Sequence, residues 1–106
     1  MINNNVLGLI GLCMRAGKIS FGADSVEDEC KRRKVKLLII AEDASERTKN
    51  KFKNIGNQYN IPIILDSTIE ELSKQIGKNN KAILGIKDIN FAKSIQKKYN
   101  GGDVIG

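Results

Sequence analysis

Three short apolar runs alternate with segments of helical periodicity along the chain, and this alternation is typical of folds in which helices cover a sheet. The runs are KLLIIAED (36–43), IPIIL (61–65) and KAILGIK (81–87). The first run is rich in Leu and Ile without polar alternation, which is typical of a strand buried on both faces. Pro62 places the second run at a sheet edge or a strand start. A short extended piece, KIS (18–20), precedes all three.

The segments around these runs predict five helices, because their apolar residues recur at steps of three and four. Two of them are expected at residues 4–15 and 24–33, and three more begin after the capping residues Ser45, Thr68 and Asp88. Together these elements predict an α/β protein, a three-layer α/β/α sandwich around a small sheet that is mostly parallel or mixed. Residues 1–99 form one domain, and residues 100–106 have too little to pack and are expected to be a flexible tail.

The chain of 106 residues is basic, with a net charge of +6. Nine of its 18 Lys and Arg residues fall in KRRKVK (31–36) and RTKNKFK (47–53), which favours a phosphate-bearing partner. No long apolar run or basic leader is visible, so we expect no membrane span, no secretory signal and a cytoplasmic location. Cys13 and Cys30 lie in apolar helical patterns and are expected to be two reduced core thiols.

Catalytic motifs are missing from the sequence. The chain has no histidine, which excludes imidazole-based catalysis and imidazole metal sites, and it has no glycine-rich nucleotide-binding motif. The best acidic candidate is the pair Glu42 and Asp43 at the carboxyl end of a predicted strand, but an Asp just before a helix is more often a cap. We therefore expect no enzyme activity, cofactor, metal ion or small-molecule substrate.

Four pieces of the sequence point to one family through their order and spacing. They are RAGK (15–18), Gly22 with the helix that follows it, AEDAS (41–45) and IGK (76–78). Over about residues 7–95 they resemble the bacterial YlxQ-like branch of the ribosomal protein superfamily of the L7Ae and L30e type, whose archaeal members bind kink-turn RNA. The resemblance implies an L30e-like domain that is non-catalytic and docks on sharply bent RNA at tandem sheared G·A pairs beside a bulge.

In that family the RNA contacts the start of the second helix, where a glycine is followed by Asn, Glu and Lys, and then by Arg. Carried over by position, Gly22 and Arg32 match this pattern, whereas Asp24, Ser25 and Asp28 replace Asn, Glu and Lys. An Asp can accept hydrogen bonds from base amino groups, but it cannot donate to the O6 and N7 atoms of guanine as a Lys or Arg does. Asp28 is therefore expected to lower the affinity or to change which RNA fits.

The resemblance thus implies an RNA-binding surface at the start of the second helix, supported by flanking basic residues. The loop GKNNKA (77–82) stands where the family covers the bulged nucleotides, and its asparagines favour hydrogen bonds and phosphate contacts over an apolar lid. The expected RNA-binding residues are Lys18, Gly22, Asp24, Ser25, Lys31, Arg32, Lys78, Asn79 and Lys81.

The expected partners are structured RNA, either kink-turn-like or ribosomal, and ribosomal or other translation proteins. Two alternatives stay open. A general binder of structured RNA would use the Lys49, Lys51 and Lys53 face of the third helix without kink-turn selectivity. A protein-interaction module of the translation machinery would instead present the acidic start of the second helix to a basic partner.

Overall fold

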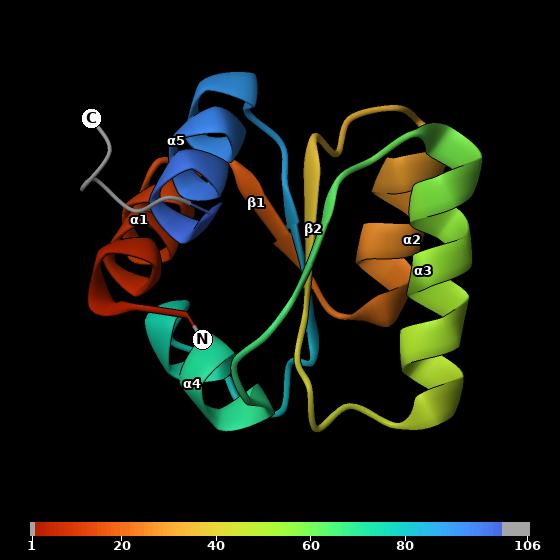
Figure 1. Ribbon diagram of the computed structural model, residues 1–106, viewed down its shortest axis with the longest axis horizontal. Helices are drawn as coiled ribbons and strands as arrows, with labels where there is room; N and C mark the ends of the chain where they lie inside the picture. The colour runs from red at the N-terminus through yellow and green to blue at the C-terminus, as the bar shows by residue number, and fades with distance from the viewer. Residues whose placement is uncertain (1, 101–106) are drawn as a thin grey trace.

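The computed structural model describes residues 2–100, and its elements follow the predicted alternation (Figure 1). The helices are α1 (Asn4–Arg15), α2 (Ala23–Lys31), α3 (Glu46–Tyr59), α4 (Ile69–Gln75) and α5 (Ile89–Asn100). The strands are β1 (Ile19–Phe21), β2 (Leu37–Ile40), β3 (Ile63–Leu65) and β4 (Ile83–Ile86). The expected tail lies outside the described residues except for Asn100, which ends α5.

The four strands form one mixed sheet in the order β1-β4-β2-β3. β2 pairs with β3 in parallel, whereas β4 is antiparallel to both β1 and β2. The mixed form of the predicted sheet is therefore correct and the mostly parallel form is wrong. β3 is an edge strand, as expected from Pro62, which lies just before it and accepts a hydrogen bond from the Leu38 N–H.

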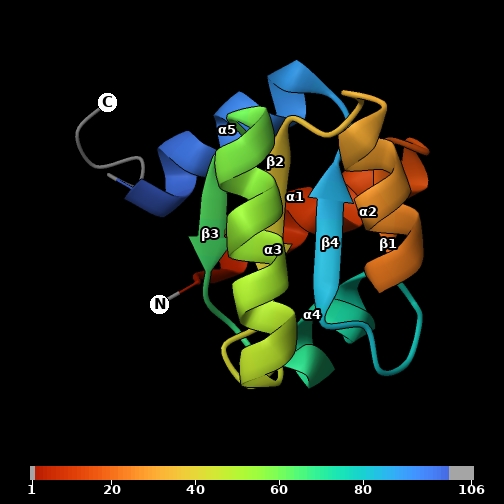
Figure 2. The ribbon, with the colours of Figure 1, turned by 90° about the vertical axis from the view of Figure 1, so that its right-hand side faces the viewer.

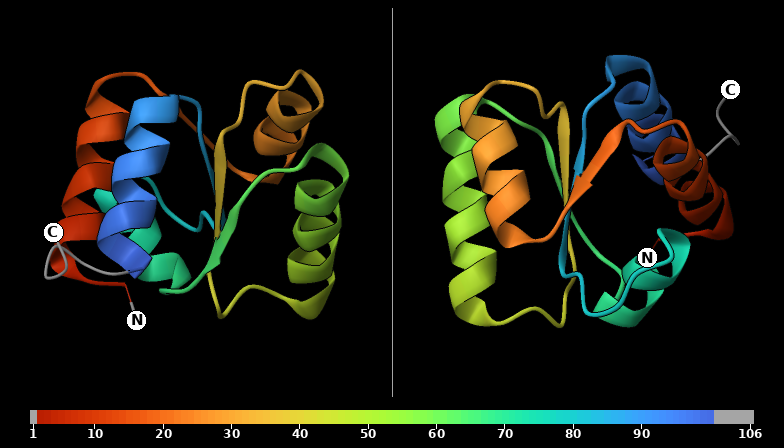
Figure 3. Two further views of the ribbon diagram at one scale, coloured as in Figure 1. Left: turned by 45° about the horizontal axis from the view of Figure 1, so that its top comes forward. Right: turned by 180° about the vertical axis from the view of Figure 1, so that it is seen from behind.

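Helices cover both faces of this sheet, and the three-layer sandwich is confirmed (Figures 1 and 3). α1, α4 and α5 lie on one face, and α2 and α3 lie on the other. All four residues of β2 are buried, with Leu37 and Ile39 facing one layer and Leu38 and Ile40 facing the other. This alternation explains why the LLII run is apolar throughout.

The predicted capping residues form hydrogen bonds at the N-termini of three helices. The side chains of Ser45 and Thr68 accept hydrogen bonds from backbone N–H groups in the first turns of α3 and α4. Asp88 Oδ1 does the same for Asn90 and Phe91 in α5, at 2.8 and 3.0 Å. These bonds satisfy donors that have no acceptor within their own helix.

Asp43 has the expected structural role but serves a different helix. Its Oδ1 accepts a hydrogen bond of 2.8 Å from the N–H of Ile69, the first residue of α4. Because Ser45 already caps α3, Asp43 is free to tie the end of β2 to the start of α4.

Both cysteines are free and fully buried, on opposite faces of the sheet. Burial is the main reason that the pKa of each thiol is raised to about 11. Within residues 2–100, no helix has the length and apolar character needed to cross a membrane. The same residues contain no group of three or more His, Cys, Asp or Glu side chains that could hold a metal ion.

Candidate nucleic-acid interface

The start of α2 is a helix N-terminus without a side-chain cap. It follows Gly22, whose φ of 86° and ψ of 149° suit a residue without a side chain. The Val26 N–H bonds to the Gly22 carbonyl at 3.0 Å, whereas the N–H groups of Ala23, Asp24 and Ser25 precede the first acceptor within the helix. Together with the helix dipole, these donors favour phosphate or base acceptors at this end.

The loop between α4 and β4 lies beside this helix start (Figure 2). The Nζ atoms of Lys78 and Lys81 lie 5.4 and 5.8 Å from the centroid of the Phe21 ring, at the end of β1. A Cβ atom at Gly22 would lie 3.8 Å from Lys81 Nζ, so this lysine passes over the glycine. The Ser73 hydroxyl fixes the loop by accepting a 2.8 Å hydrogen bond from the Lys81 N–H. Two cations therefore flank the start of α2.

Asn79 belongs to the same loop and is exposed. With Lys78 it lines a hollow of about 600 Å³ that reaches Asp43 and α4. Gly77 and Asn80 have φ values of 68° and 58°, so the backbone turns sharply on both sides of Lys78 and Asn79. These tight turns present the polar side chains of the loop at the surface instead of an apolar cover.

Two of the acidic residues of α2 are held by cations from other elements. Glu27 lies 2.9 Å from Lys51 of α3 and 3.4 Å from Lys31. The hydrogen bond from Lys51 is the largest cause of the lowered pKa of Glu27. Glu29 lies 3.4 Å from Lys87, just after β4. These acids therefore join α2 to its neighbours, and Lys31 is committed to one of them.

Asp24, Asp28 and Arg32 follow one another at four-residue steps and share a face of α2. Asp28 Oδ2 lies 3.0 Å from Arg32 Nε, with both side chains more than half exposed. Asp24 is exposed and forms no ion pair with any residue in the described range 2–100. Arg32 matches the arginine of the family pattern, and Asp28 replaces its lysine. The arginine that is kept is thus paired with the acid that replaces the lysine.

Lys31 and Arg32 lie at the end of α2, away from its first turn. Lys18 is also separated from the residues around Gly22. It stands before β1 while Gly22 stands after it, and the Lys18 carbonyl accepts a 2.8 Å hydrogen bond from the Lys87 N–H. A strand advances about 3.3 Å per residue, so β1 alone places roughly 10 Å between the two positions. The structure brings Gly22, Asp24, Ser25, Lys78, Asn79 and Lys81 to one end of the sheet. It leaves Lys18, and also Lys31 and Arg32 at the end of α2, toward the other.

The alternative RNA surface on α3 has little free charge. Lys49 lies 2.8 Å from Glu46, and its Nζ donates a 3.0 Å hydrogen bond to the Glu42 carbonyl. Lys51 is paired with Glu27. Lys53 alone of these three lysines has no ion pair within residues 2–100. The α3 face is therefore a weaker candidate for binding phosphates than the start of α2.

Sequence reasoning missed Phe21 and Ser73. The expected strand ended at Ser20, so Phe21 was not considered as a ring for Lys78 and Lys81 to pack on. Its position directly before Gly22 was the available signal. The contact between Ser73 and Lys81 joins α4 to a residue eight positions later and has no sequence signature.

Known proteins resemble this chain in sequence and in fold. Residues 4–96 match the Ribosomal protein L7Ae/L30e/S12e/Gadd45 family. The chain is 37% identical to the RNA-binding protein YlxQ of Enterococcus faecium, over 90% of this chain and 91% of the relative. It is 32% identical to the RNA-binding protein YlxQ of Bacillus subtilis (strain 168), over 82% and 87% of the two chains.

Two solved structures share the fold. A protein of unknown function from Bacillus halodurans superposes with a TM-score of 0.85 at 29% identity, covering 89% of this chain and 95% of the other. The 15.5 kD RNA-binding protein of Giardia lamblia superposes with a TM-score of 0.76 at 15% identity, over 98% and 92% of the two chains. The second likeness concerns the fold alone. With a family match over nearly the whole length, this chain belongs to the ribosomal protein L7Ae/L30e/S12e/Gadd45 family.

Proposed function

We propose that this protein is a non-catalytic RNA-binding protein that recognises kink-turn-like RNA through the start of α2. The observation that carries the proposal is the uncapped first turn behind Gly22, with Lys78 and Lys81 beside it. Backbone donors at such an end suit guanine edges and phosphates, and flanking lysines suit the adjoining backbone. The YlxQ proteins, which are named RNA-binding proteins, support the RNA-binding part of this proposal.

The family also supports a proposal about the RNA, the protein partners and the cellular location of this protein. We propose that the RNA is ribosomal or otherwise part of the translation machinery, that contacts to translation proteins accompany it, and that the protein works in the cytoplasm. The ribosomal proteins within the family support this setting. At the acidic start of α2, Glu27 is paired with Lys51 and Asp28 with Arg32, so among residues 2–100 this end offers a basic partner little more than Asp24. RNA is therefore favoured over a basic protein at this surface.

The exchange of the family lysine for Asp28 sets the expected strength of binding. In the free protein Arg32 is paired with Asp28 at 3.0 Å, and RNA must displace this pair before Arg32 can contact a base. We therefore expect selective binding to bent RNA with an affinity below that of family members that carry the lysine.

The test is a calorimetric titration of the full chain with a kink-turn RNA and with a straight duplex of equal length, at two salt concentrations. The kink-turn should bind more tightly, and Lys78→Ala should lower the slope of log K against log salt by about one. The matched control is Lys97→Ala, an exposed lysine in the last turn of α5, which should leave the slope unchanged. Equal binding to both RNAs would instead identify a general binder of structured RNA without kink-turn selectivity. Binding to neither would exclude RNA at this surface.

A further inference from the structure

The basic run KRRKVK is not used by the start of α2, because most of it lies beyond the other end of that helix. Lys34 and Lys36 lie at this far end with Lys18, from the start of β1, and Lys87, from the end of β4. Together with Gly17 and Arg33 they line a hollow of about 400 Å³, which we call the basic hollow. In Figure 1 this end of the sheet, where α2 and α3 finish and α5 begins, is opposite the loop between α4 and β4.

Helix electrostatics explain only part of this cluster. Cations after Lys31 favour the negative end of the α2 dipole, and Lys36 Nζ donates a 3.2 Å hydrogen bond to the Arg33 carbonyl. Lys18 and Lys87 come from other elements and have no such role. Lys87 lies 3.4 Å from Glu29, whereas Lys18 and Lys34 pair with no acid in residues 2–100. The positive charge of the hollow is therefore available to an anion.

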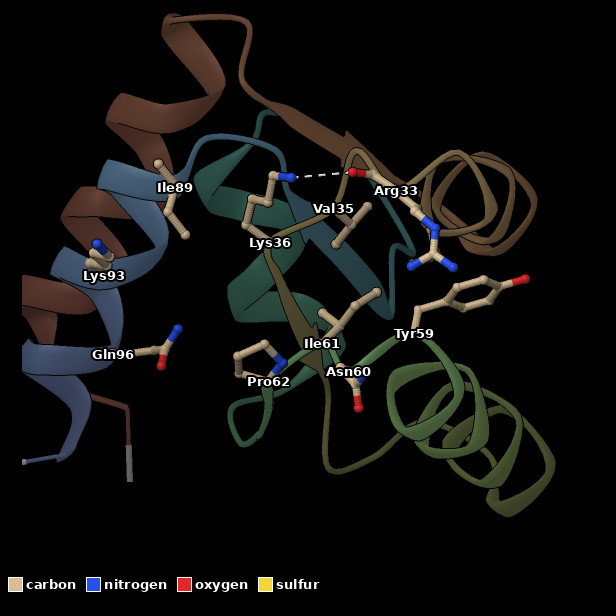
Figure 4. Close-up of a pocket in the computed structure, with 11 residues that line it drawn as sticks. Arg33, Val35, Lys36, Tyr59, Asn60, Ile61, Pro62, Ile89, Lys93 and Gln96 are labelled. Carbon is tan, nitrogen blue, oxygen red and sulfur yellow. Dashed lines mark hydrogen bonds between the residues drawn. The ribbon is translucent and has the colours of Figure 1, made fainter.

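A second concavity adjoins the basic hollow and shares Arg33 and Lys36 with it. This groove of about 490 Å³, the far groove, runs between the ends of α2 and α3 and the start of α5. Its volume is within the range of small-ligand sites. In Figure 4, Ile61 and Pro62 lie between the two sides of the groove, with Lys93 and Gln96 of α5 on one side.

The other side of the far groove carries a cation–π pair. The guanidinium carbon of Arg33 lies 5.5 Å from the centroid of the Tyr59 ring (Figure 4). A planar guanidinium held over an aromatic ring is a surface on which a nucleobase can stack. The amides of Asn60 and Gln96 also line the groove and can hydrogen-bond the edge of a base.

We propose that the far end of the sheet is a second RNA site, which binds a single-stranded segment. One base stacks on Arg33 in the far groove, and the neighbouring phosphates lie over the basic hollow. A duplex would offer only phosphates and would leave the pair of Arg33 and Tyr59 and the amides unused, and an acidic peptide would use only the cations. Because this site is at the opposite end of the sheet from Gly22, the protein could hold a bent RNA and a single strand at once.

The experiment measures the affinity of the full chain for a labelled single-stranded RNA of about ten nucleotides and, separately, for a kink-turn RNA. Arg33→Gly removes the stacking side chain at a position whose φ of 60° suits glycine, so the fold is retained. Lys34→Glu reverses one charge of the basic hollow. Each variant should weaken single-strand binding about tenfold and leave kink-turn binding within about twofold.

Two matched controls distinguish binding at this site from nonspecific attraction by the positive charge of the protein and from binding at the start of α2. Lys53→Glu makes the same charge change on the exposed face of α3 and should leave single-strand binding unchanged. Lys78→Ala should weaken kink-turn binding and spare single-strand binding. A complex already saturated with kink-turn RNA should still take up the single strand.

Several outcomes would overturn the proposal. These are no single-strand binding by the wild-type chain, equal loss in Lys53→Glu and Lys34→Glu, or competition between the two RNAs. A glutamate-rich peptide that binds as tightly and is sensitive to Lys34→Glu but not to Arg33→Gly would assign the far end to an acidic protein. If the wild-type chain binds the single strand but not kink-turn RNA, the proposed function is wrong and the single-strand site is still supported.

Discussion

At the scale of single residues, the ion pair between Asp28 and Arg32 links stability to recognition. The pair is exposed and is worth at most about 1 kcal/mol to the fold. Its larger effect is on ligand binding, because it occupies the cation and places a negative charge on the face that RNA would approach. Removing Asp28 should therefore slightly weaken the fold and strengthen binding.

We expect Asp28→Lys to tighten kink-turn binding by about 1–3 kcal/mol, since a lysine here can read a guanine edge. Asp28→Asn only releases Arg32 and removes repulsion, so its gain should be smaller. Titration calorimetry gives the affinities, and urea unfolding gives the stability of each variant. If Asp28→Lys binds no more tightly than wild type, this face of α2 does not contact the RNA.

Alanine substitutions at Gly85 and at Gly8 should change the free energy of unfolding in opposite directions. A Cβ at Gly85, inside β4, would lie 2.9 Å from Ser20 Oγ, 3.0 Å from Val35 Cγ2 and 3.3 Å from Val26 Cγ1. Gly85→Ala should therefore lower the free energy of unfolding by about 1–3 kcal/mol. Gly8 is exposed in α1, and a Cβ added there would have no atom within 4 Å, so Gly8→Ala should raise the free energy of unfolding by about 1 kcal/mol. Urea unfolding of both variants tests this, and equal signs would contradict it.

At the scale of elements, the hydrogen bond from Tyr99 to Asp66 ties the end of α5 to the loop after β3. Tyr99 Oη of the half-buried tyrosine lies 2.8 Å from Oδ2 of the buried Asp66, and the Ser67 N–H also donates to this carboxylate. Burial acts to raise the pKa of Asp66, but the donated hydrogen bonds outweigh it and the pKa is lowered. The same bond is the largest cause of the raised pKa of Tyr99.

The sign of the pH dependence follows from these directions. Asp66 binds its proton less readily when folded, so its contribution is present above the ordinary Asp pKa of about 4 and is lost as the pH falls below it. Tyr99→Phe should lower the free energy of unfolding by about 1–3 kcal/mol near pH 7 and by less near pH 3. Urea unfolding of wild type and variant at both pH values measures this difference. An equal loss at both would mean that the charge of Asp66 contributes nothing.

At the scale of the whole molecule, the sheet divides the interior into two clusters that share its strands. Cys13 lies in the cluster under α1, α4 and α5, and Cys30 lies in the cluster under α2 and α3. Each thiol therefore reports on the opening of one half of the core. Because burial raises both pKa values to about 11, neither thiol is a ready nucleophile at neutral pH.

We expect alkylation of Cys13 and Cys30 in the native protein to be slow and to proceed at the same rate, since both should require global unfolding. The rates can be followed by mass spectrometry with Cys13→Ala and Cys30→Ala as single-thiol controls, after checking that each still folds. A much faster reaction at one cysteine would show that its helical layer opens independently of the other.

The helices, the strands and the fold class could be predicted from the sequence, because they depend on local periodicity and on caps that act within a few residues. The range of α1, the buried β2 run, the caps Ser45 and Asp88 and the edge position after Pro62 all follow from such neighbours. The strand order and the grouping of the surface residues could not be predicted in this way and come from the three-dimensional structure. Pairing β4 between β1 and β2 places Lys78 and Lys81 at Gly22, but Lys18 at the other end with Lys34 and Lys87. Such contacts join residues tens of positions apart, and no local pattern in the sequence records them.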